Sequence, residues 1–376
     1  MKLYIVRPGD TLYRIAGSFS VDITELISIN QLSDPDRIVP GLCLVIPTPS
    51  YSPGECIEVN AYDYPFVGSR VLDESLPYYT TLCPFSYSAL PDGQLAPIND
   101  ERLILSALEN MTLPLLTVTN LTDEGFSASI GHAVLTDIEV QTRLFDSVLN
   151  LLKSKAYRGL NINFEYLYPF DRDSYSQFVA KAATLLHPMG YTVSTAITPK
   201  QSANQSGTLY AAHDYKAHGK YADRVILMTY EWGYTYSSPQ AVSPVNRIKQ
   251  VLDYAVTVIP REKIMMGFSN YAYDWSLPWK QGKAARVLSN SSAVSLAISR
   301  GAEIKYDEIA AAPYFNYTDA DGTGHLVWFE DPRSWQERLR LVEQYAIAGI
   351  SFWTGDNLYR PGLTVLQDMY SIQKII

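Results

Sequence analysis

The chain has 376 residues, of which 47% are hydrophobic and 18% charged, so it is long and apolar enough for more than one small domain. Its formal net charge of −9 argues against a nucleic-acid partner, because phosphate backbones are bound by basic surfaces. The three cysteines, Cys43, Cys56 and Cys83, match no metal-site spacing and cannot all pair within one chain. No apolar run reaches the roughly 18 residues of a membrane-spanning helix.

Residues 1–48 are predicted to form a small unit of their own. "KLYIV" favours a strand, and "PGDT" favours a turn in which Asp10 or Thr11 caps the following helix. A second helix is predicted after Asp22, and "IVPGLCLVIP" closes the unit with a strand. The order is strand, helix, helix, strand. Residues 49–55, which are rich in proline and polar residues, are predicted to be a linker.

This unit resembles a LysM domain, a βααβ module that binds glycans containing N-acetylglucosamine. The resemblance rests on "YIVRPGDTLYRIA", "ITELISINQL" and "IVPGLCLVIP", which together cover the whole unit. It implies that the sugar lies along two loops, formed by Gly9, Asp10 and Thr11, and by Ile38, Val39 and Pro40. The residues of the first loop also suit a simple turn and helix cap, and both interpretations can hold at once.

Residues 56–376 are predicted to form a (β/α)₈ barrel. Eight strand-like runs follow one another, most of them separated by amphipathic helical stretches, which is the pattern of a parallel barrel. The runs are "IEVNAY", "YTTLCPFSY", "LLTVTNL", "GLNINFE", "TVSTAIT", "VILMTYEW", "IMMGFSNY" and "GISFWTG". A longer piece at about 280–335, between the seventh and eighth strands, is predicted to be a small α+β insertion.

Polar residues alternate along the predicted fourth strand. Asn161, Asn163 and Glu165 occupy every second position and therefore share one face. They can fill a polar layer inside the barrel, or they can lead up to a site at the carboxyl ends of the strands, where barrel enzymes carry their chemistry. The second interpretation is favoured because apolar and aromatic residues are predicted at the same ends of other strands: Tyr62, Tyr87, Met228, Tyr230 and Trp353.

Three of these strands resemble glycoside hydrolase family 18. "GLNINFE" is similar to its fourth-strand signature D-G-x-D-x-D-x-E, "MTYEW" to its sixth-strand Met-x-Tyr-Asp, and "ISFW" to its eighth-strand Trp; the insertion is also similar. The resemblance implies a single carboxyl, Glu165, that protonates the leaving group while the substrate's own acetamido oxygen attacks, an exception to the usual pair of carboxyls. Asn163 would orient the acetamido group, Tyr230 would hydrogen-bond its oxygen, and Trp353 would form the floor. Asn161, Met228, Glu231, Tyr62 and Tyr87 would contact substrate.

The signature departs from the family at Arg158, Asn161 and Asn163, where it usually has Asp. Asn163 can accept the hydrogen bond of the acetamido N–H but supplies no negative charge. Loss of one such electrostatic stabiliser costs roughly 10²–10⁴ in rate. A compensating group, a slow enzyme and a lectin-like protein are therefore all open interpretations.

The similar subgroup is the LysM-bearing spore germination and cortex-lytic glycosidases, which cut N-acetylglucosaminyl bonds in peptidoglycan. This implies a peptidoglycan partner, no cofactor, and action at the spore coat or cortex surface. The start "MKLYIVRPGDTLYRI" does not resemble a signal peptide, so synthesis in the cytoplasm is expected. His213 and His218 fit no standard metal spacing. A silent glycan-binding protein and a structural spore-layer protein are the alternatives.

Overall fold

The computed structural model describes residues 1–48 and 54–374, so the predicted linker at 49–55 lies mostly outside the described residues. The N-terminal unit has the predicted order: β1 (Lys2–Ile5), α1 (Leu12–Phe19), α2 (Ile23–Ile29) and β2 (Cys43–Ile46). β1 and β2 pair antiparallel, with Leu3 opposite Val45. The side chain of Thr11 caps α1 by accepting from the Arg14 N–H, and Asp22 caps α2.

A closed parallel barrel forms the centre of the molecule. Hydrogen-bonded neighbours run from β3 round to β18, and β18 pairs again with β3, with Ile350 opposite Val59. The predicted (β/α)₈ barrel is therefore confirmed. Within the described residues its eight strands are β3 (Cys56–Asp63), β4 (Thr81–Pro84), β6 (Leu113–Thr119), β9 (Gly159–Asn163), β10 (Thr192–Ile197), β11 (Arg224–Leu227), β12 (Ile264–Ser269) and β18 (Gly349–Trp353).

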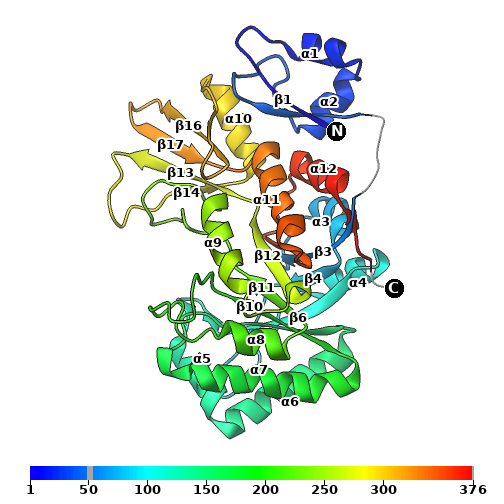
Figure 1. The fold of residues 1–376 in the computed structure, drawn as a ribbon, viewed down its shortest axis with the longest axis vertical. Coiled ribbons are helices and arrows are strands. Elements are labelled where there is room, and N and C mark those ends of the chain that lie inside the picture. Colours follow the sequence, from blue (N-terminus) through cyan, green and yellow to red (C-terminus); the bar gives the residue numbers. More distant parts are fainter. Residues whose placement is uncertain (49–53, 375–376) are drawn as a thin grey trace.

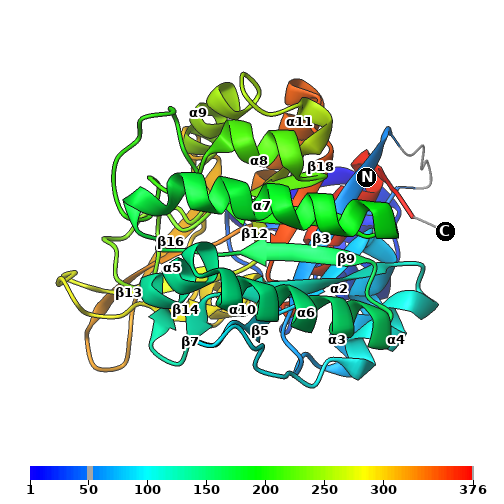
Figure 2. The same ribbon diagram turned by 90° about the horizontal axis from the view of Figure 1, so that it is seen from below.

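Helices cover the outside of the barrel, as Figure 2 shows for α6 and α7 beside β9. The outward residues of β9, Leu160 and Ile162, belong to the large apolar core beneath these helices, whereas Asn161 and Asn163 point inward. The helices are α3 (Ser69–Ser75), α4 (Glu101–Glu109), α5 (Ala128–Thr136), α6 (Ile138–Ser154), α7 (Arg172–Leu186), α8 (Tyr215–Tyr221), α9 (Val245–Ala255), α11 (Pro332–Tyr345) and α12 (Arg360–Met369). Among the described residues, none is long and apolar enough to cross a membrane.

Short elements decorate the loops. The hairpin β7 (Leu121–Thr122) and β8 (Gly125–Phe126) follows β6, β5 (Tyr87–Ser88) pairs with β6, and β19 (Ser371–Ile372) pairs with β3. Single 3₁₀ turns lie at Leu76–Tyr78, Pro169–Asp171, His187–Met189 and Arg261–Lys263.

The insertion between β12 and β18 is a five-stranded antiparallel sheet with one helix on it. Its elements are β13 (Ala272–Leu277), β14 (Arg286–Leu288), α10 (Asn290–Arg300), β15 (Lys305–Asp307), β16 (Ala312–Thr318) and β17 (Gly324–Trp328). The predicted range of about 280–335 misses β13 and includes the start of α11. Because "IMMGFSNYAYDWSL" is a nearly continuous apolar and aromatic run, the sequence does not separate β12 from β13.

The N-terminal unit is docked against the insertion, α11 and α12 (Figure 1). Val39 and Leu42 belong to the same apolar cluster as Ala297 and Ile304 of the insertion. The Ile304 N–H donates to the Pro40 carbonyl at 3.0 Å, and the Arg333 guanidinium donates to the Gly41 carbonyl at 3.1 Å. Apolar packing and hydrogen bonds to its main chain together fix the unit on the barrel and its insertion.

Replacement of Gly41 by alanine should weaken this docking. Gly41 has a φ of +83°, and a Cβ there would lie 1.8 Å from the Ile304 carbonyl oxygen. The matched control is Gly9→Ala, because Gly9 has a φ of +85° with nothing within 4 Å of a Cβ. Both substitutions cost about 1–2 kcal/mol of backbone strain. We expect Gly41→Ala to lower Tm more than Gly9→Ala in thermal unfolding; equal shifts would contradict the docking contact.

Candidate active site

Glu165 lies two residues beyond β9, at the carboxyl ends of the barrel strands. Its main chain is held on both sides by one buried side chain. The Glu165 N–H donates to Asn120 Oδ1 at 2.9 Å, and Asn120 Nδ2 donates to the Glu165 carbonyl at 2.8 Å. The Glu165 side chain therefore extends into the cleft from a main chain that is fixed in position.

A cleft of two lobes opens around Glu165. The lobes share Glu165, Tyr166, Met228, Tyr230 and Glu231. One lobe, which we call the Trp353 lobe, has a volume of about 330 Å³; it is also lined by Tyr62, Tyr64, Phe85, Leu121, Phe126, Asn163, Ala196 and Trp353. The other, the Tyr210 lobe, has a volume of about 360 Å³; it is also lined by Thr198, Pro199, Leu209, Tyr210, Trp232 and Tyr234.

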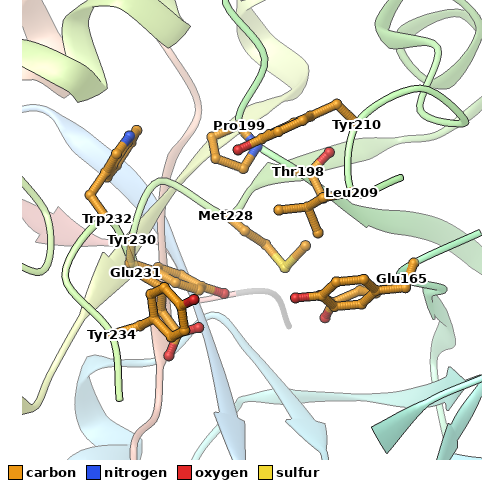
Figure 3. A pocket seen from close by; sticks show the side chains of 11 residues that line it. Glu165, Thr198, Pro199, Leu209, Tyr210, Met228, Tyr230, Glu231, Trp232 and Tyr234 are labelled. Carbon is orange, nitrogen blue, oxygen red and sulfur yellow. The ribbon is translucent and has the colours of Figure 1, made fainter. Parts of the chain in front are cut away.

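Glu165 and Tyr230 enter the shared part of the cleft from opposite walls, with Met228 between them (Figure 3). The ring of Tyr230 lies over Gly267 of β12, where an added Cβ would come within 2.8 Å of it. Glycine at that position therefore makes room for the tyrosine. In the Trp353 lobe, Trp353 meets Phe85 edge-on at 4.7 Å between ring centroids and Tyr62 at 5.7 Å. Flat apolar rings beside a few polar groups suit a sugar ring.

Burial and a neighbouring carboxyl raise the pKa of Glu165 to about 8. The neighbour is Glu231, whose own pKa is raised by burial although it accepts hydrogen bonds from the hydroxyls of Tyr271 and Tyr273. The described residues that line the two lobes include no Lys, Arg or His. Glu165 is therefore protonated at neutral pH and poised as a general acid.

Asn163 has a free acceptor in the Trp353 lobe. Its side chain hydrogen-bonds the Glu165 carboxyl, an interaction that lowers the pKa of that group against the effect of burial. Its Oδ1 is buried without a hydrogen-bond partner among the described residues. An unpaired buried acceptor is costly, and a ligand N–H would satisfy it.

Two predicted site residues lie outside the cleft. Asn161 is buried below it and bridges the Tyr62 hydroxyl, at 2.9 Å, and Ser194 Oγ, at 2.8 Å, so it belongs to the polar layer inside the barrel. Tyr87 was predicted to contact substrate, but the structure places it away from both lobes: its hydroxyl donates to the buried Asp100, and its ring belongs to the outer core. β4 ends at Pro84, so strand alternation does not extend to Tyr87, and Phe85 points into the lobe instead.

Several cleft residues come from loops that the sequence pattern did not single out. They include Tyr64, Phe85, Phe126, Tyr166, Tyr210, Trp232 and Tyr234, together with Asn120 behind the acid. Tyr166 and Glu231 follow strand ends with φ of +53° and +64°, which turn the chain sharply across the cleft. The dense aromatic stretch "YEWGYTY" was the one visible signal for the Tyr210 lobe.

In the N-terminal unit, the predicted glycan-binding residues have structural partners. The Asp10 carboxylate accepts from the Tyr4 hydroxyl and the Arg7 N–H, both at 2.8 Å, and Thr11 caps α1. Gly9 is exposed and forms the turn. In the other loop Val39 is buried, Ile38 and Pro40 are half-buried, and Pro40 carries the carbonyl bonded to Ile304. The glycan role of these six residues stays a prediction.

Comparison with known families decides the identity of both parts. Residues 122–357 match the glycosyl hydrolases family 18, and residues 4–47 match the LysM domain. The chain belongs to glycosyl hydrolases family 18. It is thus a glycosidase, and both of its domain types bind glycans that contain N-acetylglucosamine.

Relatives are similar over the whole length of this family 18 chain. The cortical fragment-lytic enzyme of Bacillus subtilis (strain 168) is 39% identical, across 100% of this chain and 99% of the relative. The crystal structure of the Bacillus megaterium QM B1551 spore cortex-lytic enzyme SleL gives a TM-score of 0.94 at 30% identity, covering 100% of this chain and 99% of that chain. The Bacillus cereus enzyme SleL gives 0.83 at 36% identity, over 99% and 87% of the two chains.

The raised pKa of Glu165 should make folding stability depend on pH. In the unfolded chain this carboxyl ionises near about 4.3, whereas the folded protein keeps it neutral up to about 8. The unfolded state therefore releases the proton first, and this group reduces stability as pH rises from about 4 to about 8. We expect Tm to fall less between pH 5 and pH 9 in Glu165→Gln than in wild type. Parallel Tm curves would contradict a neutral Glu165.

Proposed function

We propose that the protein hydrolyses N-acetylglucosaminyl β-1,4 bonds in spore-cortex peptidoglycan, with retention of configuration, during germination. The observation that carries the proposal is the protonated Glu165 at the junction of two lobes, with the acceptor of Asn163 and the hydroxyl of Tyr230 on the cleft wall. The similarity to cortical fragment-lytic enzymes supports the proposed substrate. The LysM unit supports a role in keeping the enzyme bound to an insoluble glycan.

The proposed reaction has two steps. The N-acetylglucosamine on the nonreducing side of the bond to be cut would sit over Trp353. Its acetamido N–H would donate to Asn163 Oδ1, and its acetamido carbonyl oxygen would accept from the Tyr230 hydroxyl. That oxygen attacks the anomeric carbon while Glu165 gives its proton to the leaving oxygen, so that the glycosidic bond breaks and a cyclic oxazolinium ion forms. The Glu165 carboxylate then takes a proton from water, which adds to the anomeric carbon and restores the acetamido group.

The Tyr210 lobe would hold the departing saccharide. It meets the Trp353 lobe at Glu165, and its Tyr210, Trp232 and Tyr234 offer rings for stacking on sugars. Both lobes are open to the same carboxyl group, so one acid serves the bond between them.

A catalytically weak or silent glycan binder is the second candidate, and Asn163 is the observation that favours it. The residue removes the negative charge that would offset the oxazolinium ion. Against it stand Tyr230, Trp353 and the raised pKa of Glu165, which binding alone does not need. Glu231 is the remaining carboxyl in the shared part of the cleft, and it can offset positive charge once ionised.

Hydrolysis of purified cortex peptidoglycan, followed by mass spectrometry of the fragments, separates the two candidates. We expect wild type to release fragments ending in reducing N-acetylglucosamine and Glu165→Gln to lose activity by at least about 10³-fold, as for removal of a general acid. If only Asn163→Asp cuts, the natural protein is a glycan binder. If wild type, Glu165→Gln and Asn163→Asp are all silent between pH 4 and 8, the proposed hydrolysis is wrong.

Glu231→Gln should move the alkaline limb of the pH–rate profile to lower pH. Glu231 raises the pKa of Glu165, so its neutralisation lowers that pKa, and the acid loses its proton earlier as pH rises. Activity against pH for soluble cortex fragments measures the limb. The matched control is Glu343→Gln on the exposed face of α11, which should leave the limb in place. An unmoved limb in Glu231→Gln would show that the two carboxyls do not interact.

A further inference from the structure

Asn120 ties the general acid to a small hairpin at the edge of the cleft. It follows β6, is fully buried, and uses both ends of its side-chain amide. Oδ1 accepts from the Glu165 N–H, and Nδ2 donates to the carbonyls of Glu165, at 2.8 Å, and Ser127, at 3.0 Å. Ser127 in turn donates its N–H to the Asn120 carbonyl at 2.8 Å and caps α5. One amide therefore joins the acid's main chain to the start of α5.

The hairpin between these contacts forms part of the sugar cleft. Leu121 of β7 and Phe126 of β8 both line the Trp353 lobe. The Phe126 ring stacks on Tyr166, the residue after the acid, with centroids 6.4 Å apart. Gly131 of α5 packs closely on Leu167, where an added Cβ would lie 2.3 Å from Leu167 Cδ2. Residues 120–131 thus contact residues 165–167 through a hydrogen-bonded amide, a ring pair and a close packing contact.

We propose that Asn120 is a positioning residue for Glu165, and that it sets the place of the acid relative to a sugar gripped by the β7–β8 hairpin. Asn120 touches no cleft surface and acts only through the main chain of Glu165 and Ser127. The inference rests on the proposed glycosidase function, because it assigns a role in delivering the Glu165 proton. General acids work over hydrogen-bond distances, and a displacement of about 1 Å costs up to about 10²-fold in rate.

Removal of the amide would also change the setting of the carboxyl group. Without Asn120 the Glu165 main chain loses both of its anchors, so the carboxyl can move from its buried position toward the open cleft, and a better hydrated carboxyl has a lower pKa. The titratable groups that act on Glu165 or that it acts on are Glu231, Tyr230, Tyr62, Tyr166 and Tyr175, and none of them is cationic. No positive charge would therefore mask the change. The alkaline limb of activity would move to lower pH.

The chain contains a matched control for this side chain. Asn30 of the N-terminal unit is also buried and brackets one residue in the same way: Oδ1 accepts from the Val45 N–H at 2.7 Å, and Nδ2 donates to the carbonyls of Val45, at 2.8 Å, and Leu26, at 2.9 Å. Asn30→Ala and Asn120→Ala therefore each delete three hydrogen bonds of the same kind: one accepted from a main-chain N–H and two donated to main-chain carbonyls. Only the second deletion lies behind the acid.

The test measures kcat, KM and the pH profile of the full chain on soluble cortex fragments, with Glu165→Gln as the inactive baseline. We expect Asn120→Ala to lower kcat by roughly 10- to 100-fold with KM changed less than about threefold, and to shift the alkaline limb to lower pH. Asn30→Ala should lower Tm but leave kcat, KM and the alkaline limb unchanged. Equal kinetics in the two variants would overturn the positioning role while leaving the proposed function intact.

Two further measurements keep the result decisive. If Asn120→Ala does not fold, Asn120→Asp takes its place: it keeps the volume and the acceptor for the Glu165 N–H but loses the two donated bonds, so wild-type kinetics in that variant would overturn the proposal. Carbon-13 NMR titration of labelled glutamate, with the Glu165 signal assigned by its absence in Glu165→Gln, reads the pKa of the acid without turnover. A lowered pKa in Asn120→Ala would support the positioning role, and an unchanged pKa together with a wild-type kcat would overturn it.

Discussion

The site depends on a single condition, which is that Glu165 keeps its proton at neutral pH. Aromatic rings and Met228 exclude water around it, Glu231 adds a like charge, and the described lining of the cleft supplies no cation to favour the carboxylate. The same surroundings raise the cost of an ionised acid in the folded state. The group that serves as proton donor therefore lowers the folding stability at alkaline pH, a trade-off that is common at functional sites.

The barrel supplies this environment by geometry. In β9 the outward Leu160 and Ile162 pack beneath the helices, and alternation then directs Asn161 and Asn163 inward. Asn161 satisfies its amide within the barrel, against Tyr62 and Ser194, one layer below the cleft. The next inward position reaches the mouth, and its Oδ1 meets no partner there among the described residues. One strand thus carries both the structural amide and the amide that is free for substrate.

This alternation explains how much the sequence could predict. Barrel, N-terminal unit, insertion, Glu165, Asn163, Tyr230 and Trp353 all follow from strand patterns and family resemblance, because a period of two fixes which face a residue occupies. The pattern fails where the strand stops. Tyr87 lies beyond β4, so its parity was no guide, and Asn120 reaches a partner 45 residues away that only the closed barrel brings near. The docking of Gly41 on Ile304 is likewise a tertiary contact without a local signal.

The asparagine at position 163 also fits the electrostatics of this particular cleft. Burial and the like-charged neighbour Glu231 raise the pKa of Glu165 to about 8, and the hydrogen bond from the Asn163 side chain offsets part of that rise. An aspartate at 163 would remove that donor and add a third carboxyl to a cleft whose described lining has no cation, so it would raise the pKa of the acid further. Glu165 must give its proton to the leaving oxygen in the first step, and a higher pKa would make it a weaker proton donor. The neutral amide of Asn163 keeps the acceptor that an acetamido N–H requires, and it leaves Glu165 able to give up its proton and take it back. Glu231 is the remaining carboxyl that can face the oxazolinium charge.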